Sequence, residues 1–133
     1  MTFTLDGGSP ISATVHADVF TGDDGLQVSG TFLPMGGGLV TVYATLPGVT
    51  GPGSYPISGS GSTAAYIVYD TNFNEQDWIL VGGTGTIVLD AFDVGGKNIS
   101  GHFDFTAMGT TTLQIHADFT VTQSIDVNAG SLP

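Results

Sequence analysis

Apolar and polar residues alternate almost without a break through residues 98–122. Successive side chains of a β-strand point to opposite faces, so this alternation predicts two strands that each have one apolar face. The apolar positions are Ile99, Phe103, Phe105 and Ala107 in the first strand, then Leu113, Ile115, Ala117, Phe119 and Val121 in the second. A three-residue loop at residues 108–110 would join them into a hairpin with Phe105 opposite Leu113 and His102 opposite His116.

Shorter runs of the same kind occur in the rest of the chain. Residues 11–20 alternate, residues 39–46 are apolar on both faces in part, and a long closing strand is expected over residues 111–127. Segments rich in Gly, Pro, Asp and Asn separate these runs, and none has a helical period. The pattern predicts a single domain, residues 1–133, with an all-β fold: an antiparallel β-sandwich or flattened barrel of about nine to ten strands.

The charge balance limits the partners. The chain has no cysteine, one basic residue, Lys97, and a net charge of −11. Disulfides, thiolate metal sites and cysteine nucleophiles are therefore excluded, and such a surface repels phosphate backbones and anionic lipids. No run reaches the roughly 18 apolar residues of a membrane-spanning helix. We expect neither nucleic acid partners nor membrane insertion.

The low content of charged residues points to a location. They make up only 10% of the chain, and Thr, Ser, Gly and Asn supply most of its polarity. This composition is typical of extracellular β-domains, and the acidic, lysine-poor balance also suits salty surroundings. The residues after Met1 lack the pattern of a signal peptide. Either the protein stays inside the cell, or a leader was removed ahead of Met1. The composition favours the second alternative, so we expect an extracellular or cell-envelope protein.

Several short motifs carry a family resemblance. They are residues 3–7 (Phe-Thr-Leu-Asp-Gly), 51–55 (Gly-Pro-Gly-Ser-Tyr), 65–66 (Ala-Tyr), 83–87 (Gly-Thr-Gly-Thr-Ile) and 97–107 (Lys-Asn-Ile-Ser-Gly-His-Phe-Asp-Phe-Thr-Ala). Through them the chain resembles small all-β domains of unknown function that occur as bacterial cell-envelope lipoproteins. The resemblance implies an antiparallel β-sandwich and an exported protein, and it brings no catalytic residues.

All three histidines stand two positions before an aspartate. The pairs are His16 with Asp18, His102 with Asp104, and His116 with Asp118. Residues i and i+2 of a strand share a face, so each pair offers an imidazole and a carboxylate together, a combination that suits zinc or copper. The candidate ligands are His102, His116 and Asp118, and His16 and Asp18 join them if their strand lies beside the last one. The alternative is a solvated face on which histidine relieves carboxylate repulsion.

A second candidate cation site is the loop at residues 70–77. Asp70, Asn72, Asn74 and Asp77 supply oxygen atoms in the spacing that begins a calcium loop. Glu75, however, occupies the position where a helix-loop-helix calcium site needs glycine. The alternatives are a looser calcium site and a polar hairpin loop.

Signatures of catalysis are absent. The chain has no Gly-x-Ser-x-Gly elbow and no phosphate-binding loop, and exposed strand carboxylates such as Asp104 and Asp118 lack the burial of a glycosidase acid. We expect a non-catalytic structural or interaction domain that binds protein, including further copies of itself through strand edges. The alternative is a module that binds carbohydrate with the help of calcium or zinc and stacks sugars on Trp78 or the tyrosines.

Overall fold

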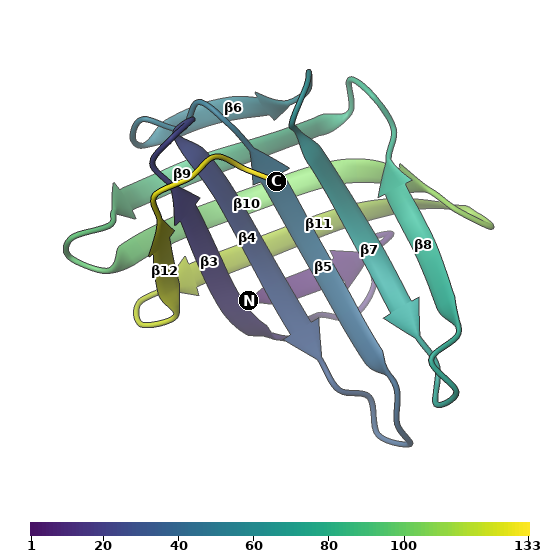
Figure 1. The fold of residues 1–133 in the computed structure, drawn as a ribbon. Helices are drawn as coiled ribbons and strands as arrows, with labels where there is room; N and C mark the ends of the chain where they lie inside the picture. The colour runs from purple at the N-terminus through teal and green to yellow at the C-terminus, as the bar shows by residue number, and fades with distance from the viewer.

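The chain folds entirely into β-strands and connecting loops in a computed structural model that describes all residues, 1–133 (Figure 1). Strands account for 61% of the residues and helices for 0%, which confirms the all-β prediction. The structure accordingly holds no helix of the length and apolarity needed to span a membrane. The strands are β1 (Thr2–Leu5), β2 (Ile11–Ser12), β3 (Thr14–Phe20), β4 (Gly25–Phe32), β5 (Leu39–Leu46), β6 (Gly53–Ile57), β7 (Thr63–Tyr69), β8 (Glu75–Leu80), β9 (Gly85–Asp93), β10 (Asn98–Met108), β11 (Thr112–Val121) and β12 (Ile125–Asn128).

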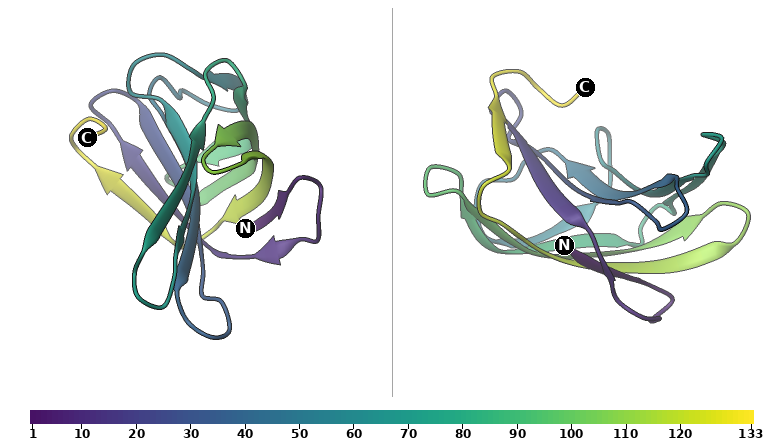
Figure 2. Two further views of the ribbon diagram at one scale, coloured as in Figure 1. Left: turned by 90° about the vertical axis from the view of Figure 1, so that its right-hand side faces the viewer. Right: turned by 90° about the horizontal axis from the view of Figure 1, so that it is seen from below.

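The strands form one continuous sheet that curls into a half-barrel (Figure 2). Their order is β12-β3-β4-β5-β7-β8-β10-β11-β1-β2, and β9 and β6 branch off beside β10. The sheet turns at β10, because β9 pairs with the first half of this strand and β8 with its last two residues. Figure 1 shows β3, β4, β5 and β7 crossing in front of β9, β10 and β11.

The strand number and direction differ from the expectation at the two ends of the chain. The run at residues 11–20 divides at Ala13 into β2 and β3, and the closing run breaks after Val121, so the structure has twelve strands. After this break the chain crosses to the other half of the sheet, where β12 pairs with β3 in parallel. The prediction of one closing strand through Val127 is wrong, and the sheet is mixed and not purely antiparallel.

The β10–β11 hairpin forms as predicted, but its register is shifted by two residues. Phe105 lies opposite Ile115, and Met108 opposite Thr112, so the loop is residues 109–111. A shift of two keeps every side chain on its face, and alternation alone cannot choose between the two registers. Gly109 fits the observed loop because a Cβ there would lie 2.4 Å from the backbone oxygen of Asp77.

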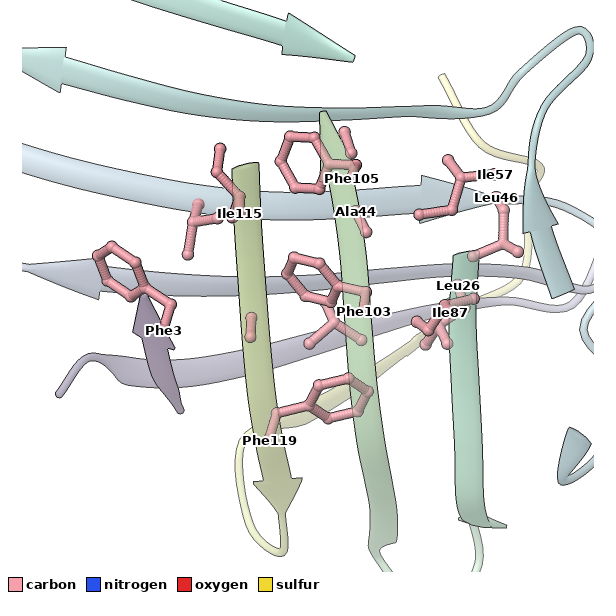
Figure 3. Packing of buried hydrophobic residues seen from close by; sticks show 14 of the residues in the cluster. Phe3, Leu26, Ala44, Leu46, Ile57, Ile87, Phe103, Phe105, Ile115 and Phe119 are labelled. Atoms are coloured by element: carbon pink, nitrogen blue, oxygen red, sulfur yellow. The ribbon is translucent and has the colours of Figure 1, made fainter. Parts of the chain in front are cut away.

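The concave side of the sheet holds the hydrophobic core, and no polar or charged residue is buried there. The apolar face of the β10–β11 hairpin contributes Phe103, Phe105 and Phe119, and the ring centroid of Phe103 lies 6.1 and 6.0 Å from those of the other two (Figure 3). Leu26 and Ala44, from β4 and β5, belong to the same cluster. The sheet thus buries one face and presents its polar face to solvent.

Candidate functional site

Histidine and aspartate alternate on the outer face of the β10–β11 hairpin. His102 and Asp104 on β10, and His116 and Asp118 on β11, point outward because the residues between them, such as Phe103, are buried. His102 lies opposite Asp118, and Asp104 lies opposite His116. The prediction that the two histidines face each other is therefore wrong, because of the two-residue shift in register. Each imidazole faces a carboxylate, which favours pairing across the strands.

His116 lies between two carboxylates. Its Nδ1 is 2.5 Å from Oδ1 of Asp104, and its Nε2 is 2.9 Å from Oδ2 of Asp118. Partial burial by itself would lower the pKa of the imidazole, but the hydrogen bonds with Asp104 and Asp118 outweigh it, so the pKa of His116 is raised above its usual value. This arrangement favours an imidazolium that bridges two carboxylates.

The three predicted ligands on this face lie near one another without converging. Both nitrogen atoms of His116 are engaged by carboxylates, and Nε2 of His102 lies 3.9 Å from Oδ2 of Asp104. The ring centroids of the two histidines are 5.6 Å apart. A metal held by His102, His116 and Asp118 would have to displace a carboxylate from His116, and such a site stays a prediction.

The third histidine belongs to a separate group on β3 and β12. His16, Asp18 and Asp126 form the one group of three in which the ligand atoms all lie within 4.8 Å of one another. The sequence identified His16 and Asp18 as a pair but gave no sign of Asp126 as their neighbour. The alternation at residues 125–128 could have predicted the strand, but its parallel pairing with β3 is a long-range contact.

The carboxylate of Asp70 stabilises its own loop. Its Oδ1 accepts hydrogen bonds from the backbone N–H groups of Asn72 and Asn74, and its Oδ2 accepts one from Nδ2 of Asn74. These bonds, that of the Asn74 side chain first, hold the pKa of Asp70 below its usual value. Asp77 lies farther along, on β8 opposite Ile67. The loop is therefore closed by its own hydrogen bonds. Calcium binding at these residues stays a prediction.

This loop presents a large apolar side chain to solvent. Phe73 is 79% exposed, and its backbone is left-handed with φ of 60°. The neighbouring loop between β4 and β5, residues 33–38, exposes Leu33 by 71% and Met35 fully. The two loops lie side by side at the lower end of the sheet in Figure 1 and in the left view of Figure 2, and a Cβ on Gly37 would lie 2.8 Å from Cγ2 of Thr71. We call Leu33, Met35 and Phe73 the apolar tip.

Carboxylates on β8 flank the apolar tip. Glu75 accepts a hydrogen bond from the hydroxyl of Tyr69, which raises the pKa of this tyrosine. Slight desolvation, followed by the charge of Glu75, raises the pKa of the exposed Asp77. This end of the molecule is therefore apolar at its loops and negatively charged along the adjoining strand.

A shallow polar depression of about 450 Å³ adjoins the histidine face. Its polar lining comes from Thr2, Asp90, Ser100, Asp118 and Thr120. The depression forms where β9 and β10 slip in register between Ser100 and Gly101, leaving Asp90 without a partner on β10. It offers two carboxylates and three hydroxyls to a small polar ligand.

Two of the aromatic residues expected to stack on sugars, Trp78 and Tyr66, are part of the core, whereas the other three tyrosines are partly exposed. Trp78 and Tyr66 are each 9% exposed, their ring centroids are 5.4 Å apart, and Nε1 of Trp78 donates to Oγ1 of Thr111. Neither offers an open ring face of the kind that stacks on a sugar.

Comparison with known proteins gives no relatives. The chain matches no protein-family model, no curated protein and no solved structure. The resemblance to cell-envelope lipoprotein domains therefore stays a prediction that rests on the short motifs alone.

Proposed function

We propose that this chain is a non-catalytic interaction domain that binds a protein partner through the apolar tip. The single observation that carries the proposal is the exposure of Leu33, Met35 and Phe73 on two adjoining loops. Soluble domains seldom expose several large apolar side chains on adjoining loops unless another molecule covers them. We also propose that the two halves of the curled sheet pack as a β-sandwich, which is supported by core residues drawn from both halves.

The backbone at Phe73 supports a role for its side chain. A left-handed conformation is unfavourable for a bulky residue, and asparagine or glycine would adopt it more easily. Asp70 offsets this cost by accepting hydrogen bonds from Asn72 and Asn74 on either side of Phe73. A phenylalanine that is strained and exposed gains nothing from packing, so we infer that it is present for contact with a partner.

The charge around the tip indicates the kind of partner. Asp70, Glu75 and Asp77 lie next to the tip, and the chain carries a net charge of −11. A protein surface with an apolar pocket and a basic rim would complement both features. A second copy of this chain would bring the same negative charge, which opposes self-association through the tips at low salt. The composition supports an extracellular or cell-envelope setting for this contact.

Association through strand edges has less support. The curled sheet leaves β2, β6 and β12 at its edges. These strands have two, five and four residues, and Pro56 interrupts the row of donors on β6. Short strands and proline are among the devices that limit edge pairing. Sedimentation that shows concentration-dependent oligomers, unaffected by changes at the tip, would favour assembly through the edges.

The polar depression favours a second candidate, a module that binds a hydroxyl-rich ligand such as a carbohydrate. Its hydroxyls and its two carboxylates, Asp90 and Asp118, can exchange hydrogen bonds with sugar hydroxyls. Binding on a glycan array that is lost in Asp90→Ala and kept in Phe73→Asn would favour this candidate.

Cross-linking in the producing cells tests the main proposal. A photo-reactive residue at position 73 is compared with one at Thr110, an exposed loop position on the β10–β11 hairpin. We expect one protein to be linked from position 73 and not from position 110. This partner, once purified, should bind the Met35→Ser variant at least about tenfold more weakly than the unaltered domain. Equal labelling from both positions, or an unchanged affinity, would contradict the proposal.

A further inference from the structure

We propose that His16, Asp18 and Asp126 bind a divalent transition metal, with zinc as the probe, and that this metal fixes the C-terminal strand β12 to β3. The site is separate from the apolar tip and does not depend on its function. It joins residues more than 100 positions apart in the sequence, on two neighbouring strands.

The distances between the ligand atoms suit zinc. Nε2 of His16 lies 3.4 Å from Oδ2 of Asp18 and 3.3 Å from Oδ2 of Asp126. With metal–ligand bonds of about 2.0 Å and tetrahedral angles, neighbouring ligand atoms of zinc lie about 3.3 Å apart. One imidazole and two carboxylates would fill three positions, and water can take the fourth.

Hydrogen bonds explain these contacts less well. An N–H donor normally lies about 2.7–3.2 Å from its acceptor, whereas Nε2 of His16 lies beyond that range from both carboxylates. His116 provides an internal comparison, because its two nitrogen atoms lie 2.5 and 2.9 Å from theirs. Both nitrogen atoms of His116 therefore have a close carboxylate partner, whereas Nε2 of His16 lies near two carboxylates and close to neither.

The other ring nitrogen of His16 is already oriented. Nδ1 lies 2.5 Å from Oγ of Ser124, to which it can donate its proton. A neutral imidazole held in this way presents the lone pair of Nε2 to the two carboxylates. Hydrogen bonds of this kind orient the histidine ligands of metal sites.

The pairing of β12 with β3 explains why a cation would stabilise this part of the sheet. Asp126 lies directly opposite Asp18 in the parallel pair, and like charges that face each other weaken a sheet. The chain has a single basic residue, Lys97, and it lies in the turn between β9 and β10. A divalent cation between the carboxylates would turn this repulsion into a link between the strands.

Calorimetric titration of the full chain with Zn²⁺, and with Mg²⁺ at the same ionic strength, tests the site. We expect one zinc ion per chain, a higher unfolding temperature with zinc than with magnesium, and slower amide exchange in β12. His16→Gln and Asp126→Asn should each weaken zinc binding by at least about tenfold, and His116→Gln should leave it unchanged.

Both test residues are partly or largely exposed, with 35% of the His16 side chain and 69% of the Asp126 side chain accessible, so the variants should fold. Circular dichroism would check that they do. Zinc affinity that is the same in His16→Gln and Asp126→Asn as in the unaltered chain would overturn the proposal. Affinity that falls only in His116→Gln would place the metal on the β10–β11 face, and equal responses to zinc and magnesium would reduce the effect to charge screening; each of these results also overturns it.

Discussion

Asp104 lies directly opposite His116 on the β10–β11 hairpin, and its Oδ1 is 2.5 Å from Nδ1 of the imidazole. Asp118 holds Nε2 of the same ring, so one histidine bridges two carboxylates. Because these groups raise the pKa of His116, the bridge stabilises the fold while the imidazole is protonated. Its contribution is complete below the unfolded pKa of about 6.5 and is lost as the pH rises through the raised folded value.

His116→Gln should therefore lower the free energy of unfolding more at acidic than at alkaline pH. The side chain is 40% exposed, so solvent screening limits the loss to about 1 kcal/mol or less below pH 6, and the loss should disappear in alkaline solution. Urea denaturation across this pH range measures it. His102→Gln is the matched control on the same face, and it should cost less stability below pH 6 because its imidazole is 3.9 Å from the Asp104 carboxylate. An equal loss at every pH would contradict the ion-pair account.

Gly101 should tolerate no side chain. A Cβ at this position, beside the register slip between β9 and β10, would lie 1.9 Å from the backbone oxygen of Val88. Gly101→Ala is expected to destabilise the fold by more than about 2 kcal/mol, because backbone must move to admit the methyl group. Gly82→Ala, where a Cβ would have no neighbour within 4 Å, is the control, and denaturation curves compare the two. Equal stabilities would show that β9 does not approach Gly101 this closely.

Asp70 should stabilise its loop only while it is ionised. Its pKa is lowered by Asn74 and Asn72, so its contribution is present above the unfolded pKa of about 3.9 and is lost as the pH falls through the lower folded value. Asp70→Ala is expected to speed amide exchange at Asn72 and Asn74 at neutral pH and to have little effect in strong acid. Exchange rates that are unchanged at neutral pH would mean that Asp70 does not hold the loop.

Local patterns predicted the all-β class and most strands, because alternation reports directly which face of a strand is buried. They gave the right faces for the β10–β11 hairpin but the wrong register, since a shift of two residues exchanges the partners of His102 without changing its face. The parallel pairing of β12 with β3 could not be predicted, because local alternation carries no information on which distant strand, such as that of Asp18, will lie beside Asp126. The exposure of Phe73 was not predicted either, because the loop at residues 70–77 has no alternation and only the folded structure shows that the side chain is exposed.

The most direct test of the interaction proposal is to measure the stability and the partner binding of Phe73→Asn together. Asparagine accepts a left-handed backbone more readily than phenylalanine, and the exposed ring adds no packing. We predict an unfolding free energy that is unchanged or higher by up to about 1 kcal/mol, with binding to the cross-linked partner at least about tenfold weaker. A variant that is less stable and still binds its partner with full affinity would show that Phe73 serves the fold, and would contradict the proposal.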